Sequence, residues 1–284
     1  MSVSTITALE RTKFVDEFKE DFERTQTILK RCVRSDGLMS AGTVKWDVVA
    51  LSEEAQTRTR NGDIPESELG LSQVTGTPKE HFMKYRIDSF DAFRSNPNVR
   101  AMQYKKALAA TNRAIDREIV TQLDTATNVI NSGSAISFAV LSTFLTWTTQ
   151  LWANDVPADG NVYGLVTPAA YAQMMRINEF KSLDFTRIQG VDQGVPMQGE
   201  MRSWLGVKWI MFTGLTNRGT STAKCHLFHQ SAIGHQIAGD PEIQAYYYQP
   251  QDRSEVWSKV WHVGKLCLQR GIVSAIHDDN AAFA

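Results

Sequence analysis

The side chains best suited to chemistry are four thiol and imidazole groups that lie close together: Cys225, His226, His229 and His235. Thiolates and imidazoles are the usual ligands of protein-bound zinc. Their spacing matches no structural zinc pattern, because no second Cys-x-x-Cys pair accompanies it. Neighbouring residues of a strand also point to opposite faces, so Cys225 and His226 would not share one cage. We therefore expect a half-buried strand here, and no metal ligands.

A second group of polar residues lies near the end of the chain and consists of His277, Asp278 and Asp279. Imidazole and carboxylate groups can act as acid and base. These three follow the last apolar run, however, where chain ends are usually solvated. Gly-x-Ser-x-Gly, His-Glu-x-x-His, Walker and dinucleotide-binding motifs are absent from the sequence. We therefore predict no catalytic residues, no cofactor and no enzymatic activity; a soluble enzyme that uses these Cys, His and Asp groups is the alternative.

Composition excludes several other classes of protein. Apolar residues make up 42% and charged residues 21% of the 284 residues, which is typical of a folded globular chain. The net charge is −1, so the basic excess of a dedicated DNA-binding protein is missing. No apolar run is long enough to cross a membrane. The three cysteines lie far apart, which favours reduced thiols over a disulfide framework.

The first long element predicted is an amphipathic helix over Leu9 to Arg34. Phe14, Phe18 and Phe22 recur every four residues and therefore share one narrow face. Acidic residues gather near its start and basic residues near its end, which suits the helix dipole. A face with three phenylalanines needs an apolar partner, either in its own domain or in a neighbouring copy.

Two alternating segments then predict a long two-stranded arm. Val44, Trp46 and Val48 alternate with polar residues from Thr43 to Leu51, and a similar alternation runs from Lys79 to Asp88. The polar segment 52–70 between them contains an Asn-Gly turn signal. Because a lone hairpin is marginally stable in water, we expect another surface to support the apolar side of these strands. On the second strand that side consists of Met83, Tyr85 and Ile87.

The remaining elements mix helices with separated groups of strands, which favours an α+β fold. The longest helix is predicted from Asn96, a suitable N-cap before Pro97, to about Val129. The other expected helices are Phe138 to Trp152 and Ala169 to about Asn178, and the expected strands are Val162 to Val166, Trp204 to Thr213, Lys224 to His229 and Val256 to Leu268.

The order of these elements resembles the Hong Kong 97-type fold of tailed-bacteriophage capsid proteins. VYGLVTPAAYAQMM resembles the strand, proline and helix that enter its apical domain, and GEMRSWLGVKWIMFTGL resembles a later glycine-containing strand passage. KCHLFHQSAIGHQIAG and VGKLCLQRGIVSAIHDD resemble its last strands. The resemblance implies an N-terminal arm at 1–37, an E-loop at 38–82, an apical domain at 161–255, and a peripheral domain at 83–160 and 256–284 with its spine helix at 96–129.

This resemblance implies a major capsid protein that assembles in the host cytoplasm into pentamers and hexamers and ends in the virion. The icosahedral head would enclose double-stranded DNA, which the wall touches without reading its sequence. Portal and scaffolding proteins are the implied partners, together with a possible decoration protein. An encapsulin-type nanocompartment shell is the alternative within the fold. The residues expected at contacts between subunits are Phe14, Phe18, Phe22, Trp46, Val48, Met83, Tyr85 and Ile87.

Three narrower expectations concern the assembled shell. Tyr246, Tyr247 and Tyr248 are consecutive, so they cannot all face one base, and packing or an intersubunit contact suits them better. The segment 52–70 contains no lysine, so we expect no lysine-mediated cross-link there. We also expect a subunit that keeps its N-terminal segment. The basic face of the long helix suits either solvent or packaged DNA.

Overall fold

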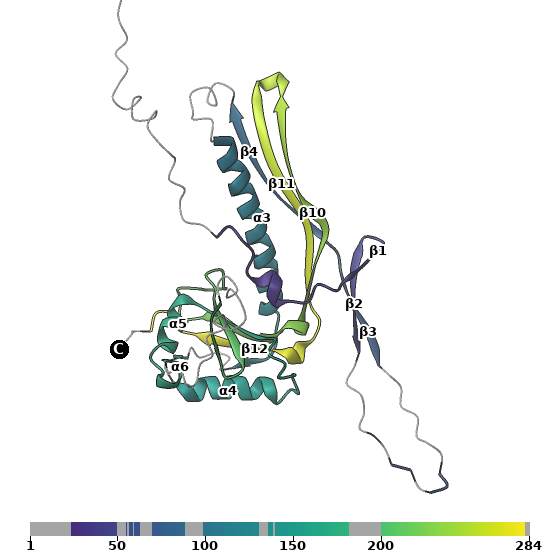
Figure 1. The fold of residues 1–284 in the computed structure, drawn as a ribbon, viewed down its shortest axis with the longest axis vertical. Helices are drawn as coiled ribbons and strands as arrows, with labels where there is room; N and C mark the ends of the chain where they lie inside the picture. The colour runs from purple at the N-terminus through teal and green to yellow at the C-terminus, as the bar shows by residue number, and fades with distance from the viewer. Residues whose placement is uncertain are drawn as a thin grey trace, which may run out of the picture. The chain divides into compact units, whose positions relative to one another are not determined.

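The computed structural model describes residues 24–49, 55, 57–58, 60–62, 70–88, 99–130, 136–138, 140–181 and 200–281 (Figure 1). The chain divides into two compact units. The first holds the described parts of residues 1–27, 79–115 and 239–262, and the second those of 28–78, 116–238 and 263–284. Residues 239–255, which we expected in the apical domain, cluster with the first unit.

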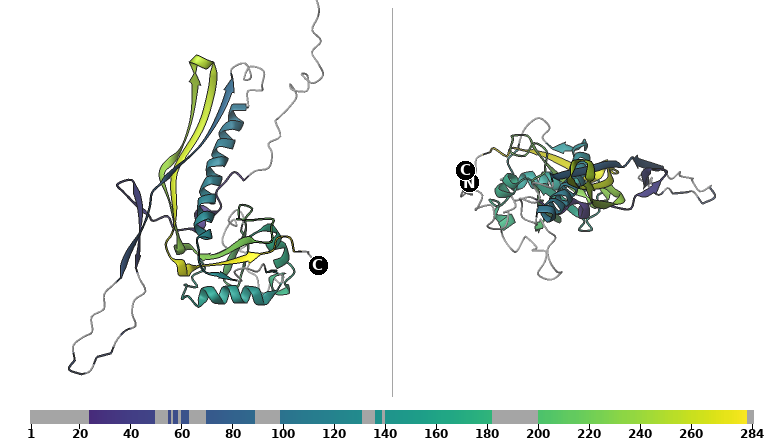
Figure 2. Two further views of the ribbon diagram at one scale, coloured as in Figure 1. Left: turned by 180° about the vertical axis from the view of Figure 1, so that it is seen from behind. Right: turned by 90° about the horizontal axis from the view of Figure 1, so that it is seen from above.

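The first unit combines a long sheet with a helix. Its sheet has the order β10-β11-β4, from β4 (Lys79–Asp88), β10 (Ile233–Tyr248) and β11 (Arg253–Leu266). Helix α3 (Val99–Asp124) runs alongside these strands (Figures 1 and 2). The alternation along β11 explains this packing, because every second side chain is buried on one side.

The contact between β11 and α3 is polar as well as apolar. Val256, Ser258, Val260 and His262 are all buried, at spacing two along the strand. The Ser258 hydroxyl donates to the Ala107 carbonyl oxygen of α3 at 3.1 Å, which fixes that side of the sheet against the helix.

The second unit contains a six-stranded mixed sheet in the order β5-β12-β9-β6-β8-β7. Every residue of β6 is buried, as expected for a central strand. Two helices that follow are α5 (Pro168–Met174), with Thr167 as its N-cap, and α6 (Asn178–Lys181). The strands are β5 (Val129–Ile130), β6 (Val162–Val166), β7 (Glu200–Trp204), β8 (Val207–Met211), β9 (Ala223–His229) and β12 (Ile272–His277).

Helix α4 (Leu141–Trp152) covers one side of this sheet with an aromatic stripe. Phe144, Trp147 and Leu151 follow at helical spacing and are fully buried. The Trp147 indole N–H donates to the Val273 carbonyl oxygen of β12 at 2.9 Å. The helix therefore belongs with the six-stranded sheet, although we had grouped it with the peripheral domain.

A small sheet, β1-β2-β3, completes the second unit, from β1 (Leu38–Ser40), β2 (Thr43–Val49) and β3 (Leu71–Gly76). Its buried side is built on Trp46, whose exposed fraction is 1%. Val44 and Val263 complete this core, and Cys267 packs against it. A Cβ atom at Gly37 or Gly234 would lie within 3 Å of the indole, so both glycines make room for the ring.

The predicted partner of the first arm strand is wrong. β2 pairs with β3, from Val44↔Gly76 to Val49↔Leu71. β4, which we expected in the arm, pairs instead with β11. The sequence LSQVTG lacks apolar alternation because most of its side chains are exposed at the edge of the small sheet. β4 alternates because one side of its sheet lies against a helix.

Several predicted boundaries also need correction. Within the described part of the segment predicted as the helix Leu9 to Arg34, only the 3-10 turn Leu29–Cys32 is helical. Helix α3 ends at Asp124 and not at Val129, because residues 129–130 form β5 at the edge of the six-stranded sheet. The strand predicted over Trp204 to Thr213 is a hairpin, since Leu205 and Gly206 both adopt positive φ angles, 55° and 73°.

We expect the substitution Gly234→Ala to destabilise the second unit by about 1–3 kcal/mol, because the new methyl group would overlap the Trp46 indole. Trp46→Ala should cost about 3–5 kcal/mol by leaving a cavity. The double variant should lose less than the sum of both, because removing the ring removes the overlap. Urea unfolding of the wild type, the two single variants and the double variant measures these losses. Strictly additive losses would contradict a direct contact between Gly234 and the Trp46 ring.

We expect stability to fall on acidification because of His235. Burial lowers the pKa of this side chain to about 4, and the nearby charge of Lys30 acts in the same direction. An unfolded histidine titrates near 6.5, so its stabilising contribution is complete above that pH and is lost as the pH falls towards 4. The loss at pH 5 should be about 2 kcal/mol. Chemical unfolding at several pH values from 7 to 4.5 measures the loss. His235→Asn should make the unfolding free energy depend less on pH, and the same pH dependence as in the wild type would refute the role of His235.

Candidate functional site: intersubunit surfaces

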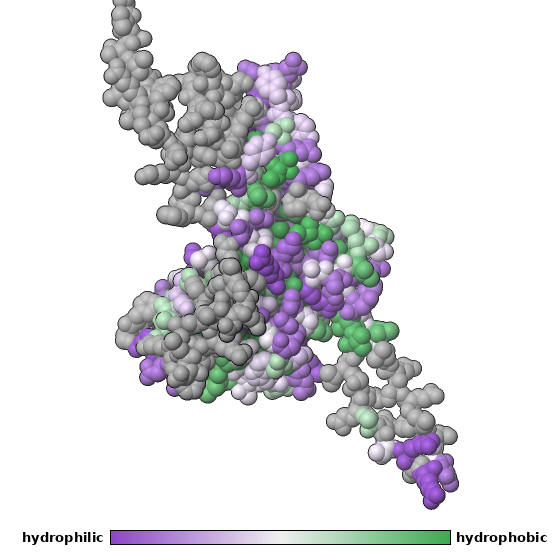
Figure 3. Space-filling model, viewed as in Figure 1, coloured by the Kyte–Doolittle hydropathy of each residue, from purple (hydrophilic) through white to green (hydrophobic). Residues whose placement is uncertain are grey.

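The outer side of the small sheet exposes apolar side chains to solvent. Leu38, Val49 and Leu71 are 67%, 54% and 72% exposed. Val49 and Leu71 are direct partners across β2 and β3, so their side chains stand together. Figure 3 shows apolar surface gathered where these two strands end. Such a pair on a two-sided ribbon is a candidate contact for another molecule.

Trp46 has a different role from the one predicted for it. Our expectation that its ring rests on a neighbouring subunit is wrong, because the ring is enclosed by its own chain. Val48, two residues further along β2, is half-buried and shares the side of Trp46. Trp46 therefore anchors the ribbon, and the opposite side carries the exposed residues.

The long sheet exposes a second, aromatic surface on the side that Phe82 occupies. Phe82 is 73% exposed and pairs with Lys259 of β11. The Lys259 ammonium lies 5.0 Å from the Trp257 ring centroid and 4.5 Å from that of Trp261, within cation–π range. Tyr246 stacks on Trp257 at 6.1 Å between centroids. Tryptophan and tyrosine side chains are enriched among the residues that dominate the energetics of protein interfaces.

The predicted contact residues of β4 lie in the other row of side chains. Met83 and Tyr85 pair with Ser258 and Val256 of β11, so they share the side on which Ser258 contacts α3. Both are half-buried within their own unit. Ile87 continues this row in register, opposite Ser254. Sequence alternation identified the two rows correctly but did not show that the helix covers the more apolar one.

Three basic side chains surround one carboxylate on the outer row of the long sheet. Glu255 forms ion pairs with Lys84, with Arg253 at 2.8 Å and with Arg86 at 3.4 Å. The hydrogen bond from Lys84 is the main reason why the pKa of Glu255 is lowered. The same row contains further acids, since Asp88 pairs in register with Arg253 and Glu242 forms an ion pair with Lys259 at 2.9 Å, so charges of both signs lie beside the aromatic residues.

The tyrosine triplet lies at the end of β10 and is exposed throughout. Tyr246, Tyr247 and Tyr248 are 53%, 59% and 44% exposed. Only Tyr246 stacks on Trp257, whereas the Arg253 guanidinium lies 5.0 Å from the Tyr248 ring centroid. The prediction for Phe14, Phe18 and Phe22 concerns residues outside those that the structure describes.

The four candidate metal-binding residues have separate environments. Cys225 is fully buried, and burial raises the pKa of its thiol to about 12. His229 contacts Asp159 at 3.1 Å and Ser231 at 2.7 Å. His235 is enclosed elsewhere, beside the backbone of Arg34. Among the described residues, no group of three or more potential ligands is close enough to hold a metal ion.

A buried Ser–His–Asp arrangement around His226 was not predicted from the sequence. Its Nδ1 lies 2.9 Å from the Ser274 hydroxyl, and its Nε2 lies 3.4 Å from Asp124. Burial alone would raise the pKa of Asp124, but hydrogen bonds from His226 and Thr216 outweigh it and lower that pKa. Ser274 is only 3% exposed and lies between two paired strands, so the arrangement ties the end of α3 to the sheet and offers no access to a substrate.

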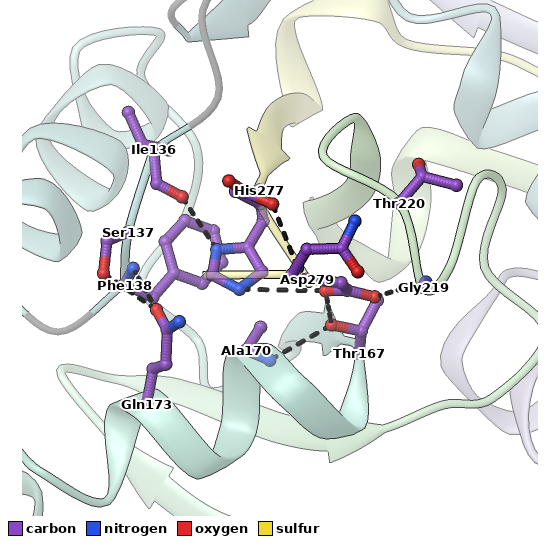
Figure 4. A network of polar contacts seen from close by, with 12 residues as sticks. Ile136, Ser137, Phe138, Thr167, Ala170, Gln173, Gly219, Thr220, His277 and Asp279 are labelled. Carbon is purple, nitrogen blue, oxygen red and sulfur yellow. Dashed lines mark hydrogen bonds and ion pairs between the residues drawn. The ribbon is translucent and has the colours of Figure 1, made fainter. Parts of the chain in front are cut away.

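The expectation that the residues after the last apolar run are solvated is wrong for His277 and Asp279 (Figure 4). Burial lowers the pKa of His277, whose Nδ1 lies 2.8 Å from the Ile136 carbonyl oxygen. Asp279 accepts hydrogen bonds from the Thr167 hydroxyl at 2.6 Å and the Gly219 amide at 2.8 Å. These polar groups therefore hold the end of the chain to the N-terminus of α5 and to a nearby turn.

Comparison with known proteins agrees with a structural role. The chain is similar over most of its length to three solved structures from phages and a GTA particle, each at 14% identity or less. A chain from Mycobacterium phage Che8 has a TM-score of 0.69 at 14% identity, with 94% of this chain and 96% of that chain covered. The capsid of cyanophage P-SCSP1u has a TM-score of 0.68 at 14% identity, with 98% of this chain and 96% of that chain covered.

The capsid of a native GTA particle gives a TM-score of 0.70 at 11% identity, covering 98% of this chain and 100% of that chain. These likenesses show the Hong Kong 97-type fold that the order of elements predicted. No curated protein matches the chain. None of the described helices is long and apolar enough to span a bilayer. The model of the family described as phage capsid protein matches residues 6–273, and the chain therefore belongs to the phage capsid protein family.

Proposed function

We propose that this capsid protein forms pentamers and hexamers of an icosahedral head that encloses double-stranded DNA. Its function as a major capsid subunit follows from its family. We assign the six-stranded sheet with its helices to the apical domain, and the long sheet with α3 to the peripheral domain. Portal, scaffolding and decoration proteins are further partners that the family resemblance suggests, with assembly in the host cytoplasm.

The observation that carries the proposal is the contrast between the two sides of the β2–β3 ribbon. One side is anchored in the chain's own core through Trp46, and the other exposes Leu38, Val49 and Leu71. The outer side also carries Lys45, Asp47 and Gln73, so it is a mixed polar and apolar surface. Such a surface on a rigid base suits a ribbon that extends onto a neighbouring subunit. Burial of each such side chain contributes roughly 1.5–3 kcal/mol, and closed rings repeat that gain around the shell.

The aromatic outer row of the long sheet is the surface that we propose to receive a neighbouring subunit. Phe82, Trp257 and Trp261 provide apolar area, while Lys84 and Arg86 provide positive charge. The segment 52–70 contains five acids and two arginines, and we propose that its carboxylates add to the ion pairs that Lys84 and Arg86 form with Glu255. Exposed ion pairs contribute only about 0–1 kcal/mol each, so the apolar contacts should dominate.

Packaged DNA would meet the wall through phosphate contacts without sequence readout. The basic residues of helix α3 outnumber its acids, which are Asp116, Glu118 and Asp124. The basic residues are Arg100, Lys105, Lys106, Arg113 and Arg117. Such a surface binds phosphates non-specifically and in a salt-dependent way.

The direct experiment is expression of the chain with and without a candidate scaffolding protein, followed by negative-stain microscopy. Closed shells of one size are the expected product. A monodisperse small species under all conditions would contradict the proposal. Particles that hold protein cargo in place of DNA would indicate a nanocompartment.

We expect the double substitution Val49→Ser with Leu71→Ser to impair assembly more than folding. Both side chains are more than half exposed, so their loss should change the unfolding free energy by less than about 0.5 kcal/mol. Ser72→Thr, which keeps the hydroxyl that donates to Val48, is the matched control on the same strand. Sedimentation of assembled shells and circular dichroism measure the two effects, and normal shells from the double variant would exclude this ribbon face from the contact.

We expect Phe82→Ser to weaken the shell while the subunit keeps its fold, because the ring is 73% exposed in the isolated chain. The loss per contact should be roughly 1.5–3 kcal/mol. Phe82→Leu, which retains most of the apolar area, should preserve assembly. Heat release of subunits from purified shells, followed by light scattering, measures the difference; equal stability of the serine variant and wild type would remove Phe82 from the interface.

A further inference from the structure

Helix α4 presents to solvent a surface without any charged side chain. Residues 125–154 contain no Asp, Glu, Lys, Arg or His, although 21% of the chain is charged. The buried stripe of α4 accounts for only one side of this helix. Leu145 on its other side is 45% exposed and Val140, which precedes it, is 53% exposed. Solvent-facing sides of helices ordinarily carry charges, so this side has the composition of an interface core.

A groove of about 640 Å³ lies on this exposed side, between α4 and the outermost described strand, β5. It lies entirely within the second unit. Its lining combines aliphatic, hydroxyl and amide groups from Val129 and Ile130 of β5 and from Leu145, Thr146, Thr149 and Gln150 of α4.

The groove is held rigidly from beneath. The Trp147 indole donates to the Val273 carbonyl oxygen, and Phe144 packs edge-on against Trp209 at 5.4 Å between centroids. Ser274 of β12 pairs in register with Val129 of β5, so the same sheet supports both walls. A partner that binds a rigid surface loses less conformational entropy than one that must order it.

The chemistry of the lining decides which kind of partner fits. Nucleic acid is excluded as the occupant, because phosphate binding depends on Lys and Arg and the groove has neither. A protein surface that is also uncharged meets these walls without burying an unpaired charge. Membership of the capsid family makes copies of this chain the neighbours that surround each subunit.

We propose that the groove between α4 and β5 is a contact surface for a second copy of this chain in the shell. The contact is heterologous: a different patch of the neighbour enters the groove, as closed rings of identical subunits require. The proposal rests on the shell function proposed above and names one of the surfaces that the shell buries.

The test measures the accessibility of the groove before and after assembly. The substitution Thr149→Cys places a thiol in the groove, and Ala158→Cys places one at an exposed loop position of the same unit as the control. Maleimide labelling is followed in unassembled subunits and in shells made from this chain alone, with the wild-type rate subtracted. We expect labelling of Thr149→Cys to slow by about tenfold or more on assembly, while the control changes little.

A charge introduced into the groove gives the second measurement. Leu145→Glu should leave the melting temperature of the subunit nearly unchanged but strongly reduce the yield of shells, whereas Ala158→Glu should assemble normally. Normal shells from Leu145→Glu would overturn the proposal, as would unchanged Thr149→Cys labelling in shells. Protection that appears only when a second phage protein is added would also overturn it. A wild-type chain that forms no shells with or without a scaffolding protein would instead overturn the proposed function, and this proposal with it.

Discussion

The Trp46 indole, enclosed between glycines, is the contact on which the arrangement of the second unit depends. Gly37 precedes the small sheet, and Gly234 begins β10, so one ring joins segments that are almost two hundred residues apart in the chain. Val263 of β11 completes the same core. Because a Cβ at either glycine would overlap the ring, the contact tolerates almost no change in the size of its neighbours. The ribbon is therefore fixed on the side of Trp46, where only Met39 of β1 remains largely exposed among the described apolar residues.

Polar groups inside the protein serve the same structural purpose. His226 links Ser274 to Asp124 at the end of α3, and Asp279 links the chain end to Thr167 at the N-cap of α5. Such groups would suggest chemistry if they lined an open site. Because they are buried and contact groups on other elements, they connect those elements instead. Neutral buried histidines also couple the fold to pH, since acid favours the unfolded chain.

Three surfaces of the protein expose apolar side chains. The ribbon, the aromatic row of the long sheet and the α4 groove each carry apolar side chains that the isolated chain leaves in water. Each contributes only a few kcal/mol by area, less than the net stability of a typical domain. If every copy in a closed shell makes the contacts proposed for these surfaces, weak surfaces suffice for a strong lattice.

The sequence by itself determined the order of elements, and with it the fold. Local patterns can be recognised without knowing which elements pack together. They include the apolar alternation of β2 and β4, the helix start at Thr167-Pro168 and the consecutive apolar residues of β6. The sequence did not determine which strand pairs with which: β4 looks like an arm strand until its pairing with β11 is seen.

Only the tertiary structure showed which side of each element faces solvent. Trp46 and Phe82 are both aromatic residues on alternating strands, yet one is 1% and the other 73% exposed. The difference arises from glycines and strands distant in sequence, which close around the first ring and leave the second uncovered. Contacts between subunits depend on that exposure. Burial is decided by the packing of the whole chain, so the periodicity of one segment does not predict it.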